Sequence, residues 1–188
     1  MICISRNTKK LTLIILFLAG STAAIAQNFG TKTAKVVIFS STPIEDIKAV
    51  TEKGVGILIP KSKEVVFQIQ IKSFAFAKGL MQEHFNENYM ESDKFPYAKF
   101  KGNIQQDIDL SKEGIFPVTV KGLLNVHGVD KPRTVPGQME IKNGAVRITT
   151  SFDVPCVDHK IKIPTLVVTK IAEVIKVSVD AQLNPLSR

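Results

Sequence analysis

Three histidines are the side chains in this sequence best suited to binding a metal, and they stand far apart from one another. They are His84, His127 and His159. Three histidines can hold a zinc ion, but none of these has a second ligand at the short spacing that metal motifs use. We therefore predict no metal site and no cofactor. A metal- or haem-associated role that uses the histidines stays open as an alternative.

The densest cluster of groups suited to acid–base chemistry is Glu83, His84 and Glu87. A general base and a group that orients it could be built from such residues. A lone acid–histidine cluster is, however, more typical of a solvated helix face. The chain also lacks a nucleophile elbow, a phosphate-binding glycine loop and an HExxH zinc motif. These observations predict that the protein is not an enzyme and has no catalytic residue.

A single cysteine, Cys156, follows the first 26 residues, so no internal disulfide is expected. It stands between Pro155 and Val157, and nothing beside it in sequence would activate its thiol. The favoured interpretation is a small buried residue.

Most of the chain after Thr33 alternates between apolar and polar residues, as half-buried strands do. In the clearest case, residues 65, 67, 69 and 71 are apolar, and residues 64, 68 and 70 are polar. Strands are predicted at 35–41, 47–51, 55–59, 64–71, 98–106, 116–126, 135–142, 146–152 and 175–183. Turns are predicted at 52–54, 61–63, 112–114 and 142–144. The pattern favours an antiparallel sandwich or barrel.

One segment, 74–90, breaks this pattern because it is rich in helix-forming residues and contains no proline. Its apolar residues recur at spacings that give one apolar face. We predict a short helix that packs across one end of the sheet, or that serves as a lid over a cavity.

The apolar faces of the predicted strands form a stripe that would point into the barrel. Alternation shows that a face is buried, but it does not distinguish a solid core from a hollow interior. The candidate ligand-binding residues in this stripe are Phe67, Ile69, Ile71, Phe100, Ile104, Val118, Val120, Leu124, Phe152, Val177 and Val179.

The N-terminus has the three parts of a secretory signal peptide. Basic residues at 6, 9 and 10 precede an apolar run at 11–19, and Ala24-Ile25-Ala26 then forms a cleavage pattern. The apolar run is shorter than the roughly 20 residues that a spanning helix needs. Cleavage after Ala26 would leave one domain at 27–188 without a membrane span. It would also reduce the formal charge from +8 to +5, because three of the basic residues lie in the removed segment.

Several longer stretches resemble the YceI-like family of exported bacterial proteins. They are residues 71–74, 80–96 and 98–102, the strand and turn at 122–129, and the elements at 152–154 and 161–164. The similarity spans roughly Thr33 to Leu183. It implies a lipocalin-like antiparallel barrel with a helix near one end. It further implies an apolar channel for polyisoprenoids or other long-chain amphiphiles.

From these features we predict a periplasmic or secreted protein that encloses a polyisoprenoid, quinone-like or fatty-acyl molecule. The alternative is a non-enzymatic stress-response or interaction protein with a filled barrel. No nucleic acid is expected as a partner, because the basic residues are scattered and form no run. A homodimer stays open.

Overall fold

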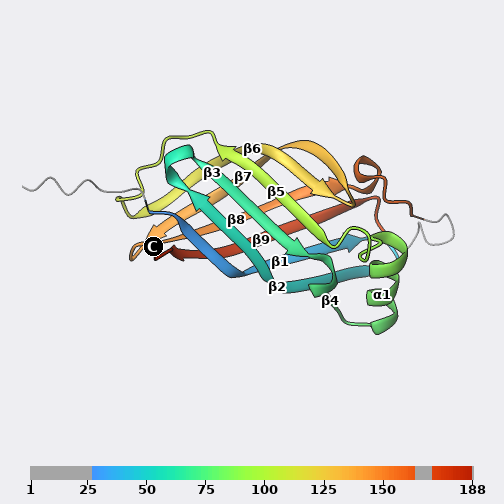
Figure 1. Cartoon of the computed structure of the whole chain (residues 1–188). Coiled ribbons are helices and arrows are strands. Elements are labelled where there is room, and N and C mark those ends of the chain that lie inside the picture. Colours follow the sequence, from blue (N-terminus) through green and yellow to red (C-terminus); the bar gives the residue numbers. More distant parts are fainter. Residues whose placement is uncertain (1–26, 164–170, 188) are drawn as a thin grey trace, which may run out of the picture.

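The computed structural model describes residues 27–163 and 171–187, and they form the antiparallel barrel that the sequence predicts. Figure 1 shows its long, tilted strands and the short helix α1 at one end. The strands are β1 (Phe29–Ser41), β2 (Asp46–Ile59), β3 (Glu64–Gln70), β4 (Ala75–Phe76), β5 (Tyr97–Ile104), β6 (Gly114–Val126), β7 (Val129–Lys142), β8 (Ala145–Pro155) and β9 (Val174–Pro185). The predicted signal peptide at 1–26 lies outside the described residues.

Eight of these strands close the barrel in the order β1-β9-β8-β7-β6-β5-β3-β2, because β2 pairs back onto β1. The two-residue strand β4 lies outside this ring and pairs with the first half of β2. Closure leaves the long strands with no free edge. Each strand also turns alternate side chains inward, which gathers the apolar face of every strand into one interior.

The prediction of two strands separated by a turn at 52–54 is wrong, because β2 runs without a break from Asp46 to Ile59. Its pairing with β1 shifts register on both sides of Ala34. Gly54 lies opposite Ala34, where a Cβ on the glycine would come within 2.8 Å of the Ala34 carbonyl oxygen. A glycine that reads as a turn signal is therefore used for a close approach between two bent strands.

Two hairpins use the turn residues that tight reversals require. Asn143 and Gly144 have positive φ angles of 50° and 71° between β7 and β8, as expected at 142–144. His127 and Gly128 have φ angles of 51° and 70° between β6 and β7. Two consecutive residues with positive φ are typical of the tight turn that matches the twist of antiparallel strands.

The helix is shorter than the predicted 74–90. Phe74 is buried, β4 follows it, and α1 then covers Gly79–His84 and continues as a π-helical turn at Phe85–Tyr89. Gly79 therefore stands at the start of the helix rather than inside it, where it would cost most. The helical segment lies across the end of the barrel at which β1, β6 and β8 finish and β2, β7 and β9 begin.

The other end of the barrel is filled. Residues from every wall are packed there with almost no exposed surface, and we call this region the packed half. Its most deeply buried members are Ala34, Leu58, Met139, Ile141, Val146, Ala181 and Leu183. In the described part of the chain, no helix is long and apolar enough to cross a membrane.

Candidate functional site

The half of the barrel under the helix is hollow. A cavity of about 570 Å³ extends from mid-barrel to the helix end, which we call the mouth. Its size falls within the range of small-molecule binding sites. The interior is therefore divided into a packed half and a hollow half, and both the solid and the hollow interpretations of the alternating pattern hold over part of the barrel.

Ten of the eleven candidate residues line this cavity. They are Phe67, Ile69, Ile71, Phe100, Val118, Val120, Leu124, Phe152, Val177 and Val179. The exception is Ile104, which is buried as expected but lies in the packed half. It borders a separate small cavity of about 40 Å³ together with Leu58 and Met139. The alternation of apolar and polar residues identifies an inward side chain, but it does not show at which point along the strand the interior becomes solid.

A second set of lining residues was not among the candidate ligand-binding residues. They lie on β1, on the segment from Phe74 to Met90, at the end of β8 and on the chain after it. They include Val36, Ile38, Phe74, Phe76, Leu80, Met81, Phe85, Met90, Val154, Cys156 and Ile161. On β1, residues 36–39 are all apolar, so alternation there does not identify the inward face. The apolar face predicted for the helical segment does line the cavity, in agreement with the lid interpretation, through residues such as Phe76, Leu80 and Phe85.

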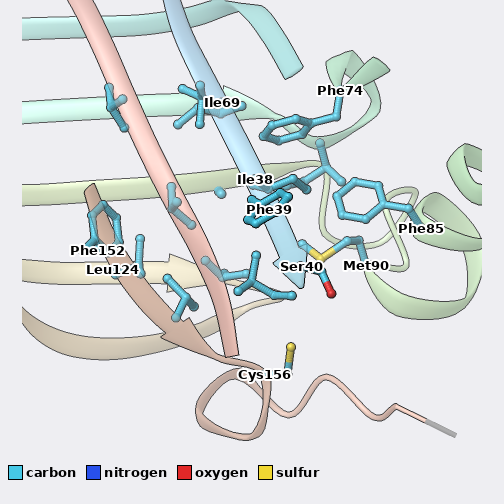
Figure 2. Close-up of a pocket in the computed structure, with 18 of the residues that line it drawn as sticks. Ile38, Phe39, Ser40, Ile69, Phe74, Phe85, Met90, Leu124, Phe152 and Cys156 are labelled. Carbon is cyan, nitrogen blue, oxygen red and sulfur yellow. The ribbon is translucent and has the colours of Figure 1, made fainter. Parts of the chain in front are cut away.

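An aromatic cluster closes the helix side of the cavity. The ring of Phe85 lies 5.9 Å from Phe74 in an edge-on arrangement and 4.9 Å from Phe76. Figure 2 shows Phe74 and Phe85 entering the cavity on the side opposite Phe152 and Leu124. Such pairs add to the stabilisation from burial alone, so the helical segment is held against the barrel by apolar contacts.

Charged groups in the lining are confined to the mouth. Glu45 and Lys78 form an ion pair with Oε1 and Nζ 2.8 Å apart, and two further lining residues there, Lys99 and His84, are exposed. Other polar groups in the lining are few and mostly engaged. The Ser40 hydroxyl accepts a 2.8 Å hydrogen bond from the Ala172 N–H. The Thr150 hydroxyl donates one of 2.5 Å to the Pro136 carbonyl.

The thiol of Cys156 also lines the cavity, and it is not activated. Burial, followed by the negative charge of Glu173, raises its pKa to about 11. Because the thiolate is the reactive form, this cysteine stays a neutral apolar group near neutral pH. Burial also raises the pKa of the Tyr89 hydroxyl at the helix exit.

Two of the three histidines lie next to each other, in a hydrogen-bonded group beside the mouth. The Nδ1 atom of His127 lies 3.2 Å from the carbonyl oxygen of His159, and its Nε2 atom lies 3.0 Å from the carboxylate of Glu91. The fully buried ring of His159 donates from Nδ1 to the Val129 carbonyl at 3.1 Å. These contacts tie the helix exit and the short 3-10 helix η4 (Cys156–His159) to the β6–β7 turn.

The same helix η4 is fixed by an ion pair. Arg133 Nη2 donates to Asp158 Oδ2 at 2.5 Å, and this bond holds the pKa of the Asp158 carboxyl below its usual value. His84 lies on the exposed face of α1 with Glu83, apart from the His127–His159 pair. In residues 27–163 and 171–187, no three His, Cys, Asp or Glu side chains are grouped so that they could hold a metal ion.

A closed eight-stranded antiparallel barrel has an interior that is either filled by side chains or holds one small ligand, as in lipocalins. The family model for the YceI-like domain matches residues 19–183, and the chain belongs to this family. None of the curated proteins matches the chain.

Solved structures share this fold at low sequence identity. A polyisoprenoid-binding domain from Saccharophagus degradans is similar with a TM-score of 0.73 and 13% identity, over 86% of this chain and 100% of that chain. BcnA of Burkholderia cenocepacia has a TM-score of 0.66 and 13% identity, over 80% and 95%. The YCEI protein of Campylobacter jejuni has a TM-score of 0.64 and 17% identity, over 78% and 90%.

Proposed function

We propose that this protein is an exported binding protein that encloses one long apolar molecule, a polyisoprenoid, quinone-like or fatty-acyl chain, in the hollow half of its barrel. The observation that carries the proposal is the cavity of about 570 Å³, whose walls below the mouth are almost wholly hydrocarbon. Belonging to the YceI-like family supports the same class of ligand.

Hydrophobic enclosure supplies enough free energy for this role without any polar anchor. Each methylene removed from water contributes about 0.8 kcal/mol, which is offset in part by the cost of immobilising the ligand. Cavity residues such as Phe67, Leu124 and Val177 provide such a surface from three different strands. A molecule that is insoluble in water would thus be held in solution without chemical change.

Export is supported by the signal-peptide pattern at 1–26. The proposed location is extracytoplasmic, periplasmic or secreted. The proposed role needs no catalytic group, metal or cofactor.

The alternative, an interaction protein with a filled barrel, predicts a different result in a direct test. The protein would be released gently from its native compartment and weighed by native mass spectrometry. We expect an additional mass that is lost on extraction with organic solvent and identified as a lipid. A variant with a smaller cavity, Val177→Trp, is expected to carry less of it, whereas Ser178→Trp, which changes the next residue of β9, keeps it. An unliganded mass for the wild type, together with no uptake of added lipid, would overturn the proposal.

A further inference from the structure

The cavity ends over the same short stretch of four neighbouring strands, β1, β9, β8 and β7. Val36, Gly137, Ile148 and Val179 line it. The next inward residues toward the packed half are Ala34, Met139, Val146 and Ala181, which do not line it and are at most 1% exposed. The barrel is therefore hollow above this level and solid below it.

Side chains from other strands complete this floor. Phe67 lines the cavity and belongs to the same buried cluster as Met139, and its ring packs over Gly56 of the paired strand, where an added Cβ would come within 2.4 Å of the ring carbon Cε1. Met139 lies between the two hollow regions, because it borders the small lower cavity and pairs with Ile148, which lines the upper one. The lower cavity, at about 40 Å³, has room for about one water-sized group.

The dimensions above the floor limit the length of chain that can be enclosed. From Val118 to Val126, both lining residues of β6, the strand spans eight residues or about 26 Å, which is about 20 Å along a tilted barrel axis. An extended hydrocarbon advances about 1.25 Å per carbon–carbon bond, as 1.5 Å bonds at tetrahedral angles require. The depth thus accommodates about 16 carbons. The volume of about 570 Å³ gives a similar limit of about 19 water-sized groups.

We propose that the ligand is a single chain of about 16 to 18 carbons, and that the floor at Met139 and Phe67 sets this length. The inference rests on the proposed function. A longer chain would leave its remaining carbons outside the mouth, where they gain nothing from the cavity. A polar end of the chain would lie at the mouth, where Glu45 and Lys78 neutralise each other and Lys99 is the remaining charged lining residue.

A series of straight-chain primary alcohols of 10 to 26 carbons tests this directly, using displacement of 1-anilinonaphthalene-8-sulfonate from the whole mature chain. We expect affinity to rise about fourfold per methylene up to about 16 to 18 carbons and then to stay level. Met139→Ala removes three heavy atoms from the floor and joins the lower cavity, so its plateau should begin about three to four carbons later.

Ile141→Ala is the matched control, since Ile141 is also buried in the packed half but borders neither cavity. It should keep the wild-type plateau. Ile148→Phe adds three heavy atoms above the floor, so the plateau should begin about three carbons earlier even if Met139→Ala does not fold. A rise that continues to 26 carbons, or a plateau that neither Met139→Ala nor Ile148→Phe moves, would overturn the length limit. Binding of no alcohol at any length would overturn the proposed function as well.

Discussion

The buried imidazole of His159 makes the stability of the barrel depend on pH just below neutrality. Its side chain is fully buried, with Nδ1 bonded to Val129 and no hydrogen-bond partner for Nε2 in the described structure. Burial lowers the pKa of this histidine from its ordinary value of 6.5. The folded state therefore favours the neutral ring. The nearest charged groups are Arg133, which opposes protonation, and Asp158, which favours it.

The direction in which stability changes with pH follows from proton binding. Below about pH 6.5 the unfolded chain takes up a proton at His159 that the folded chain does not, so stability falls as pH decreases. The free energy of unfolding therefore decreases between pH 7.0 and pH 5.5, by at most about 1.2 kcal/mol, which is the limit for a folded ring that stays neutral throughout. Asp158 and Asp180 have lowered pKa values, so they reduce stability only at lower pH, near and below the ordinary aspartate value of 3.8.

Urea unfolding at both pH values, followed by far-ultraviolet circular dichroism, measures this difference. His159→Asn retains an amide donor near the position of Nδ1 but does not titrate, and we expect it to lose most of the pH dependence while being less stable overall. His84→Asn, on the exposed helix face, should keep the wild-type dependence. An equal pH dependence in His159→Asn and the wild type would refute the reasoning.

Two further predictions concern strand contacts and the cavity thiol. Gly122→Ala should destabilise the fold by about 3 kcal/mol or more, because its Cβ would lie 2.2 Å from the Lys101 carbonyl oxygen. Gly79→Ala, with no atom within 4 Å of the added carbon, should leave stability unchanged or raise it by up to about 1 kcal/mol; equal urea midpoints for the two variants would contradict this contrast. With its pKa at about 11, Cys156 should react with iodoacetamide at pH 8 at least tenfold more slowly in the folded protein than in urea, and equal rates would disprove its burial.

Most of the fold was predictable because the two signals that determine it are local. Alternation in 64–71, 116–126 and 175–183 reflects burial of one face, and turn residues such as Asn143-Gly144 reflect a backbone geometry that few residues adopt. Gly54 was misread because the same residue type serves turns and close strand contacts. The late start of the helix, at Gly79 and not at residue 74, was missed because Phe74 and Phe76 pack against Phe85 in a contact that only the folded chain creates.

The lining of the cavity was predictable in type but not in extent. The alternation of apolar and polar residues placed Val118, Leu124 and Val179 on the inner face, and all three line the hollow half. The height at which the interior fills depends on how Met139 and Phe67 meet side chains from other strands. That is a property of packing between distant segments, so Ile104 could not be separated from its neighbours by sequence.

Photo-crosslinking tests most directly whether the ligand lies inside the barrel. A 16-carbon alcohol with a diazirine at mid-chain would be bound, irradiated and mapped by peptide mass spectrometry. We expect labels on inward residues of β3, β6 and β9, such as Ile69, Val120 and Val177, and competition by the unlabelled alcohol. Labels confined to exposed apolar side chains such as Ile115 and Leu123, which are 65% and 51% exposed, would contradict enclosure.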